Sequence, residues 1–382
     1  MVCRVGMRRL LALGGRKFSL TAFMFGQSDG FYYDFTRTDR HFQEYTGQTL
    51  ADDIGEAIGL ALDQRTWGGA SLSGALGPEL VPDPTFGSAS GLTVQAYWTI
   101  ADGVATRITG ASGTAIYPTG SLVAVGGLYR VRYQITNIAA GSCIAAVGSV
   151  GGISRATSGS FEEYILATVA NGSPTASGML LYGTPTFAGS VDDWSVKRVP
   201  GYSALQATGA AKPTRQTSGA KFDGSDDNLL TTYYAGSAAG FIMALGTMPA
   251  SPATDQILCG ASDSGPSNRC YLLVSASGGV VCGGLGGQSA ATIKGTTDVR
   301  SRRVVVCLTW DATSVTLFVD GVIEYTGARS GNPTTATPWR VGAHNAAGTA
   351  GSFFGGAIEK IITGREYLTA SKERQVRLAL LA

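Results

Sequence analysis

The chain has 382 residues, of which 44% are hydrophobic and only 15% are charged, and its formal net charge is +2 at neutral pH. This composition excludes a disordered chain, and the charge gives no broad electrostatic attraction to nucleic acid, so no nucleic-acid partner is expected. Fifty-four glycines with so few charged residues are typical of an all-β protein with many tight turns. This length suits two or three domains. No apolar run reaches the roughly 18 residues that a membrane span needs, so no membrane insertion is expected.

The six cysteines do not form a metal-binding pattern. They include no Cys-x-x-Cys pair, and the chain has only two histidines, so a structural zinc site is not expected. Most of the cysteines stand inside apolar strand patterns, which predicts buried free thiols. A disulfide between Cys270 and Cys282 is the alternative.

Residues 1–77 are predicted to be an arm that precedes the globular domains. The first 17 residues carry five basic side chains and no acid, and residues 18–26 (FSLTAFMFG) are apolar but too short to bury themselves alone. One interpretation is an anchoring arm that docks on another subunit. The other is a first strand of the following domain, preceded by a frayed basic end.

Within this arm, residues 31–64 (FYYDFTRTDRHFQEYTGQTLADDIGEAIGLALDQ) resemble a segment of bacteriophage structural proteins that precedes lectin-like domains. The resemblance implies a virion protein, made in the cytoplasm of the bacterial host, that contacts other virion proteins through residues 1–77. A homo-oligomer is expected, with a trimer preferred. From the residues alone, Phe42, Tyr45 and the lone His41 are predicted to be packing residues. Ile54, Ile58, Leu60 and Leu62 are predicted to lie over the next domain.

Residues 78–200 carry one strand pattern after another. In 128–138, for example, Val131, Tyr133 and Ile135 alternate with polar residues at the period of a half-buried strand. Trp98 and Trp194 stand within such alternation and are predicted to be core residues. The pattern favours an antiparallel β-sandwich.

The two ends of this region, ELVPDPTF…YWT and GSVDDWSVKRV, resemble the first and last strands of a carbohydrate-binding jelly roll of the galactose-binding type. In that family an acidic residue near the last strand helps to hold a structural calcium ion. The resemblance therefore nominates Asp192 and Asp193 as calcium ligands, with solvent-facing turn residues as the alternative, because calcium takes six to eight oxygens. No other cofactor is expected.

Residues 201–220 are polar and small, and are predicted to be a linker to a domain of residues 221–382. The clearest pattern of the whole chain lies in this domain, at residues 302–327, where two strands and the start of a third are expected. Asp320-Gly321 accepts the positive φ angles of a tight hairpin turn. The residues expected on the inner face are Val304, Val306, Leu308 and Trp310 in the first strand, and Val315, Leu317 and Val319 in the second.

The same domain resembles a laminin-G-like, concanavalin A-type lectin domain. The resemblance rests on FDGSDDNLL (residues 222–230), the two strands above, WRVGAH (residues 339–344) and the closing FFGGAIEKIITGREYLTASKERQVRLALLA (residues 353–382). Thr369 is the expected N-cap of one C-terminal helix. The expected fold is therefore all-β, with two consecutive antiparallel β-sandwiches, jelly-roll-like and then concanavalin A-like, an N-terminal anchoring segment and a short C-terminal helix. Residues 221–382 are expected to fold alone.

Two loops of this domain combine the groups that sugar sites use, an aromatic plane with amides and carboxylates. The candidate ligand-binding residues are Asp226, Asp227, Tyr233, Tyr234, Trp339, Arg340, His344 and Asn345. Trp339 is alternatively a core residue. Asp223 joins Asp226 and Asp227 in a turn, for which a metal site is the alternative.

The chain lacks the acid-rich E-x-D-x-x-E run of glycosidases with this fold, and its paired acids, Glu162-Glu163 and Asp192-Asp193, are adjacent and would face opposite ways in a strand. An enzyme is therefore not expected. The expected function is a virion structural protein that binds host-surface polysaccharide or lipopolysaccharide, as a tail fibre, tail tip or head fibre. A purely structural head-decoration or minor tail subunit and a glycan depolymerase are the alternatives.

Overall fold

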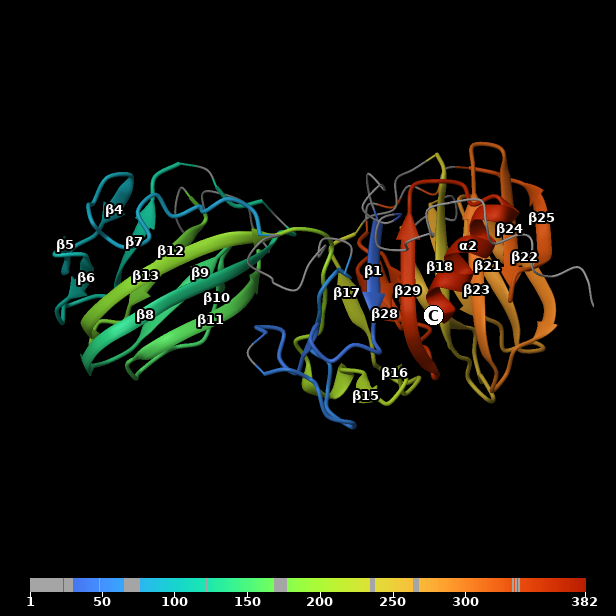
Figure 1. Cartoon of the computed structure of the whole chain (residues 1–382), viewed down its shortest axis with the longest axis horizontal. Helices are drawn as coiled ribbons and strands as arrows, with labels where there is room; N and C mark the ends of the chain where they lie inside the picture. Colours follow the sequence, from blue (N-terminus) through green and yellow to red (C-terminus); the bar gives the residue numbers. More distant parts are fainter. Residues whose placement is uncertain are drawn as a thin grey trace, which may run out of the picture.

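The computed structural model describes residues 23, 30–47, 49–64, 76–120, 122–124, 126–167, 177–233, 238–263, 268–331, 333, 335 and 337–382. Its strands form two antiparallel β-sandwiches that follow each other along the chain and lie side by side along the long axis of the molecule (Figure 1). The all-β prediction is confirmed. Within the described residues no helix is long and apolar enough to cross a membrane.

The first sandwich consists of two five-stranded sheets, in the orders β10-β9-β12-β7-β4 and β11-β8-β13-β6-β5. Its strands are β4 (Leu92–Val94), β5 (Trp98–Ala101), β6 (Val104–Arg107), β7 (Thr114–Pro118), β8 (Leu128–Ala140), β9 (Cys143–Val147), β10 (Val150–Gly151), β11 (Gly159–Leu166), β12 (Met179–Gly183) and β13 (Ala188–Val199). Trp98 and Trp194 lie in the core between the two sheets, as predicted.

The second sandwich also has two sheets. The strands of the one that carries the hairpin are β1 (Gly30–Asp34), β15 (Thr214–Gln216), β16 (Gly219–Lys221), β18 (Gly240–Thr247), β23 (Arg303–Trp310), β24 (Ser314–Val319), β25 (Val322–Ala328) and β29 (Ala357–Gly364). The strands of the other are β2 (His41–Phe42), β3 (Leu60–Ala61), β14 (Ala204–Leu205), β17 (Leu229–Thr231), β19 (Gln256–Ser262), β20 (Arg269–Val274), β21 (Val280–Leu285), β22 (Gln288–Asp298), β26 (Arg340–Val341), β27 (His344–Ala346) and β28 (Thr349–Gly351).

The predicted hairpin is present, and local chemistry explains it. Asp320 and Gly321 have φ angles of 50° and 82°, the positive pair that a two-residue turn with the right twist needs. All seven residues predicted for the inner face of β23 and β24 lie in the core of the second sandwich. The alternate residues Val305, Cys307 and Phe318 lie under the helix α2 (Ala370–Leu381). Both faces of β23 and β24 are thus buried.

Thr369 is the N-cap of α2, as predicted, and its side chain accepts a hydrogen bond from the backbone N–H of Lys372. Val376 and Leu380 of the helix pack on the sheet. The five described cysteines are free and buried, which confirms that prediction, and Cys3 lies outside the described residues.

The arm predicted for residues 1–77 is not separate from the domains. β1 pairs with β29 from Gly30–Gly364 to Asp34–Lys360, and Figure 1 shows it (blue) beside β29 (red). Phe31, Tyr33 and Phe35 are fully buried in the core of the second sandwich. From Gly30 onward the segment is therefore a strand of the second sandwich and not of the first, the domain that follows it in the chain. The anchoring prediction for residues 1–22 and 24–29 lies outside the described residues.

The predicted linker, residues 201–220, also belongs to the second sandwich. It contains β14, β15, the 3₁₀ turn η3 (Gly209–Ala211) and the start of β16, and β14 pairs with both β3 and β17. The small polar side chains of this segment predict a linker. Its backbone N–H and C=O groups nevertheless pair with strands in both sheets of the second sandwich. Independent folding of residues 221–382 stays a prediction, and the pairing of β1 with β29 and of β14 with β17 speaks against it.

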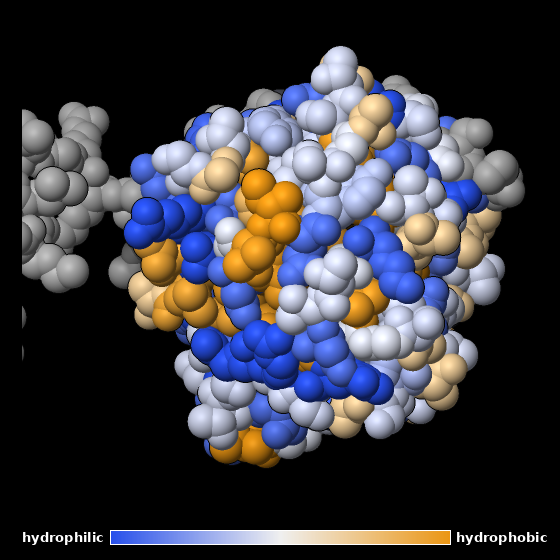
Figure 2. All heavy atoms as spheres, turned by 90° about the vertical axis from the view of Figure 1, so that its right-hand side faces the viewer, coloured by the Kyte–Doolittle hydropathy of each residue, from blue (hydrophilic) through white to orange (hydrophobic). Residues whose placement is uncertain are grey.

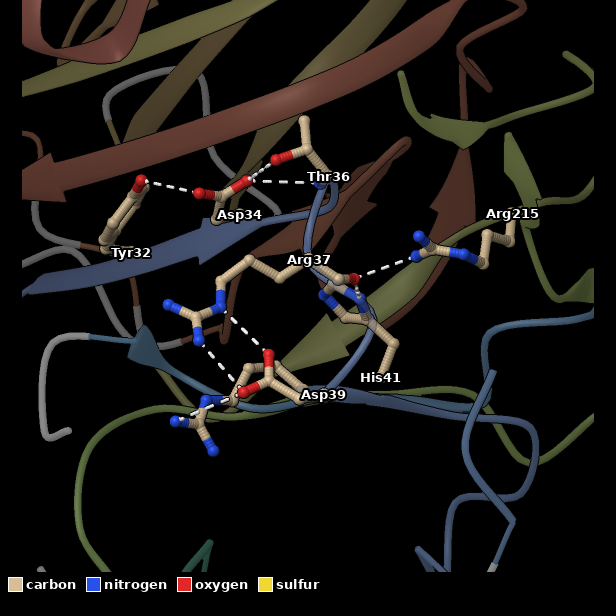
Figure 3. Close-up of polar contacts among 8 residues, drawn as sticks. Tyr32, Asp34, Thr36, Arg37, Asp39, His41 and Arg215 are labelled. Carbon is tan, nitrogen blue, oxygen red and sulfur yellow. Dashed lines mark hydrogen bonds and ion pairs between the residues drawn. The ribbon is translucent and has the colours of Figure 1, made fainter. Parts of the chain in front are cut away.

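A set of polar contacts holds the turn that follows β1 (Figure 3). Asp34 accepts hydrogen bonds from the backbone N–H and the hydroxyl of Thr36. Arg215 of β15 donates to the carbonyl of Arg37, and His41 Nδ1 lies 3.0 Å from the same oxygen. His41 is buried, and burial lowers its pKa to about 4, so the ring is neutral at physiological pH. His41 is thus a packing residue, as predicted.

At the end of the molecule remote from the first sandwich, side-chain hydrogen bonds join the edge strands β22 and β25, and Gln288 Nε2 donates one of them to the carbonyl of Ala328. The Glu324 carboxylate accepts hydrogen bonds from the backbone N–H groups and the hydroxyls of Thr296 and Thr297. Burial opposes ionisation of Glu324, but these hydrogen bonds outweigh it and lower the pKa to about 2. Figure 2 looks onto this end, where apolar areas (orange) alternate with polar ones. The exposed apolar residues next to the hairpin turn are Val322 and Ile323.

Candidate functional site

The two loops predicted to bind ligand lie next to each other in the second sandwich. β17 pairs with β26, with Leu230 opposite Arg340 and Leu229 opposite Val341. Arg340 Nη1 donates a hydrogen bond to Asn228 Oδ1 across this pairing. Two segments separated by more than a hundred residues in the chain are therefore brought to one place.

The functional side chains here lie on the outer face of the sheet. Val341 is in the core, so its neighbour Arg340 points to the opposite face. Tyr271 of β20 lies on that face too, because Leu272 next to it is in the core. Gly260 of β19 stands between Arg340 and Tyr271 in the same row and adds no side chain.

His344 completes this group. Its ring lies against the ring of Tyr271, with centroids 5.3 Å apart at an angle of 73°. Burial lowers the pKa of His344 to about 4, and the charge of Arg269 adds to the effect. The imidazole is therefore neutral at physiological pH, so one ring nitrogen can donate and the other can accept a hydrogen bond.

Two polar atoms of the group are unused within the part of the chain that the structure describes. Arg340 Nε and His344 Nε2 have no hydrogen-bond partner there, although both are shielded from solvent. Unpaired buried polar atoms are rare in folded proteins and call for a ligand, a water molecule or a functional reason. The outer face around Arg340, His344 and Tyr271 is therefore the candidate binding site of this sandwich.

Three other predicted site residues are not available to a ligand. Trp339 and Tyr233 are 0% and 3% exposed, and their rings pack edge to face in the core with centroids 5.0 Å apart. Asn345 is 1% exposed, and its Nδ2 donates to the carbonyl of Pro338. These assignments are wrong, since aromatic residues at strand ends look alike in sequence whether they face the core or solvent. Tyr234 lies outside the described residues.

Tyr271 was not predicted as a site residue. It stands in the apolar run RCYLLV, where a tyrosine has the same pattern as a core residue. Only its alternation with the buried Leu272 and Cys270 indicates the outer face.

Asp223, Asp226 and Asp227 form a compact acidic turn beside this site, with one carboxylate oxygen of each within 4.8 Å of the others. Asp223 Oδ1 accepts from the N–H of Ser225, and Asp227 Oδ2 accepts from the N–H of Asp223. Burial raises the pKa of Asp227 to about 7, with the charges of Asp223 and Asp226 adding to the shift. These contacts are those of a self-capped turn, as predicted.

Asp192 and Asp193, nominated for calcium, lie in an irregular part of β13. Asp192 Oδ1 accepts from the backbone N–H of Asp193. Among the described residues, the acidic group with metal-site spacing is the 223–227 turn, and it does not include them. Two carboxylates supply only part of the six to eight oxygens that calcium takes, so a calcium ion at this pair stays a prediction.

Comparison with protein families matches residues 242–366 to Laminin_G_3, described as the concanavalin A-like lectin/glucanases superfamily. A search of curated proteins finds no match. The matched region lies entirely within the second sandwich.

Several sialidase structures are similar to parts of the chain. The CBM40 of the Ruminococcus gnavus IT-sialidase is 20% identical, with 37% of this chain and 82% of that chain covered and a TM-score of 0.30. Trypanosoma rangeli sialidase in complex with the inhibitor DANA is 17% identical, with coverages of 48% and 30% and a TM-score of 0.35. The NanB sialidase from Streptococcus pneumoniae is 15% identical, with coverages of 35% and 23% and a TM-score of 0.29. This chain spans less than a third of either sialidase. Scores this low carry no argument. The family match, which covers about a third of the chain, and the topology together show that the second sandwich has a concanavalin A-like fold.

Proposed function

We propose that this protein is a bacteriophage virion protein that binds host-surface glycans through its lectin-type sandwich and catalyses no reaction. The observation that carries glycan binding is the outer-face group of Arg340, His344 and Tyr271, with Arg340 Nε and His344 Nε2 unpartnered among the described residues. A guanidinium and a neutral imidazole recognise sugar hydroxyls, and the buried ring of Tyr271 supports His344 from behind.

The virion part of the proposal is supported by the resemblance of residues 31–64 to a segment of phage structural proteins. In the structure residues 31–64 contact both sandwiches, and the proposal keeps attachment to other virion proteins within residues 1–77. A homo-oligomer, with a trimer preferred, belongs to the same proposal, and light scattering on the purified chain measures it.

The non-catalytic part is supported by the arrangement of the paired acids. Glu163 is fully buried in the first sandwich, whereas Glu162 beside it is exposed on the other face of β11. Two carboxylates on opposite faces cannot act on one glycosidic bond.

A glycan array tests the binding proposal on the full chain. Arg340→Ala and His344→Ala are each expected to weaken the strongest signal about tenfold, which corresponds to ~1.4 kcal/mol. Arg374→Ala is the matched control. It removes the same charge as Arg340→Ala does, but from an exposed position on the remote helix α2. No array signal, or equal binding by all three variants, contradicts the proposal. Release of reducing sugar from host polysaccharide would show a depolymerase instead.

Immunogold labelling of intact virions with an antibody to this chain tests its location. Label on the particle surface supports a virion protein. Absence of label from virions, with the protein abundant in infected cells, overturns that part.

A further inference from the structure

The first sandwich contains a groove of about 390 Å³ on the outer face of the sheet β11-β8-β13-β6-β5. The polar side chains that line it are Arg132, Gln134, Ser160, Glu162, Asp193 and Ser195. Figure 1 shows β8, β11 and β13 as long strands lying side by side in the first sandwich. The Arg340 group belongs to the second sandwich. This groove plays no part in the proposed function.

Strand register explains why these side chains gather. Val131, Tyr133 and Ile135 of β8 lie in the core, so Arg132 and Gln134 between them point outward. On the neighbouring strand β11, Glu162 stands opposite Arg132 and Ser160 opposite Gln134. The groove floor is thus built from two adjacent rungs of polar side chains.

The third strand contributes Asp193 through a bulge. The pairing of β13 with β8 shifts between Asp192 and Ser195, and Ser195 returns to the register opposite Arg132. Asp193 lies in the bulge with a φ angle of 51°, a conformation that costs a non-glycine residue about 1 to 3 kcal/mol. Trp194 next to it is anchored in the core, so the bulge turns Asp193 toward the groove.

The ion pair on the groove floor holds two side chains in place, but a ligand can replace its contacts. Arg132 Nε lies 3.3 Å from Glu162 Oε2, and the two side chains are 55% and 40% exposed. An exposed ion pair of this kind contributes only about 0 to 1 kcal/mol. Both groups can therefore turn their remaining donors and acceptors to a ligand at little cost.

The chemistry of the lining selects the ligand. Arg132, Gln134 and Ser160 can donate hydrogen bonds, while Glu162, Asp193 and Gln134 can accept them, so neighbouring hydroxyl groups that both donate and accept find partners. The hydroxyl of Ser195 donates to Glu79 instead. One positive charge faces two negative charges, which leaves the groove with a formal charge of −1 and repels a carboxylate ligand. Pro84 at the rim adds an apolar contact.

We infer that this groove is a second glycan-binding site and that it takes an uncharged oligosaccharide in preference to one that carries sialic or uronic acid. The site is distinct from the Arg340 group, and the two differ in charge. The first sandwich is thereby more than a spacer for the lectin domain.

The test is a titration of the full chain with two sets of probes. One set holds neutral hexasaccharides of glucose, mannose, galactose and xylose, and the other holds sialyllactose and oligogalacturonate. Gln134→Ala and Glu162→Ala are expected to weaken the binding of a neutral hexasaccharide at least about tenfold, while Arg340→Ala leaves it unchanged. Thermal melting of each variant checks that the sandwich is folded.

The double variant Glu162→Gln, Asp193→Asn tests the charge argument with little change in shape. It is expected to bind oligogalacturonate at least about tenfold more tightly than the wild type does. Binding of no neutral probe, binding that Arg340→Ala alone removes, or an acidic glycan held in the wild-type groove would each overturn the inference. If all binding depends on Arg340, the proposed function stands and the groove inference fails. If binding depends on Gln134 and Glu162 but not on Arg340, the groove inference stands and the proposed function fails.

Discussion

The ring of Tyr164 in the first sandwich lies against the ring of Phe42 in the N-terminal segment, with centroids 5.7 Å apart. The backbone N–H of Tyr164 also donates to the carbonyl of Thr46 at 2.6 Å. Leu60 and Leu62 of the same segment belong to this apolar cluster, together with Leu128 and Val199 of the first sandwich. Residues 30–64 thus form part of the second sandwich and at the same time bind the first.

Phe42→Ala is expected to loosen this junction. Removing a buried phenylalanine costs about 3 to 5 kcal/mol, and here the loss falls on the contact between the sandwiches. Calorimetry should then show two separate melting transitions, and small-angle scattering should show a wider range of molecular shapes. Ile54→Ala is the control, since Ile54 is 66% exposed. A single unchanged transition for Phe42→Ala would mean that the junction is held elsewhere.

Truncation at two points tests whether β1 is part of the lectin-type sandwich. A chain of residues 30–382 loses the contact of Phe23 with Phe241 and is expected to melt only a little below the full chain. A chain of residues 36–382 lacks Phe31, Tyr33 and Phe35 and leaves part of the edge of β29 unpaired, so it is expected to be insoluble or to lose at least about 3 kcal/mol of stability. Equal unfolding free energies for the two chains, measured in urea, would show that β1 is dispensable.

These results indicate which features the sequence could predict. The hairpin at Asp320-Gly321 was predicted correctly because turn chemistry and alternation are properties of neighbouring residues. The pairing of Tyr33 with Ile361 was not predicted, since strand pairing over such a separation leaves no local periodicity. For the same reason the small residues of β14 and β15 were mistaken for a linker.

The candidate site was predicted in part. Arg340 and His344 were predicted as site residues. The pairing of β17 with β26 explains why Arg340 lies next to Asn228. Trp339 and Tyr233 were misassigned, because burial of an aromatic ring depends on Phe31, which arrives from the far end of the chain. The groove around Arg132 was missed, since it exists only when β8, β11 and β13 lie in register.

Gly321→Val is expected to destabilise the second sandwich by about 1 to 3 kcal/mol, because a β-branched residue resists a positive φ angle. A side chain there would also meet the guanidinium of Arg377, 2.4 Å from the added Cβ. Gly209→Ala is the matched control, since a Cβ at Gly209 meets nothing within 4 Å. Urea unfolding of the two variants measures the difference, and an unchanged midpoint for Gly321→Val would contradict the strain argument.

The acidic turn gives a prediction about pH. Burial and two neighbouring carboxylates raise the pKa of Asp227 to about 7, above its ordinary value of 3.8. The folded chain therefore holds a proton that the unfolded chain has already lost, and stability falls as the pH rises through the window from about 4 to about 7. Asp227→Asn keeps an oxygen that accepts from the N–H of Asp223 but cannot ionise.

The variant is consequently expected to melt about 2 to 4 °C above the wild type at about pH 8, the shift that ~1 kcal/mol gives in a domain of this size, and to match it at about pH 4. Asp226→Asn, in a half-exposed neighbour, controls for removing one charge from the turn. A gap that stays constant over the whole pH range would refute the titration argument. Added calcium distinguishes the metal alternative: if the three carboxylates bind the ion, it raises the melting temperature of the wild type at about pH 8 and leaves that of Asp227→Asn lower, which would reverse the predicted order.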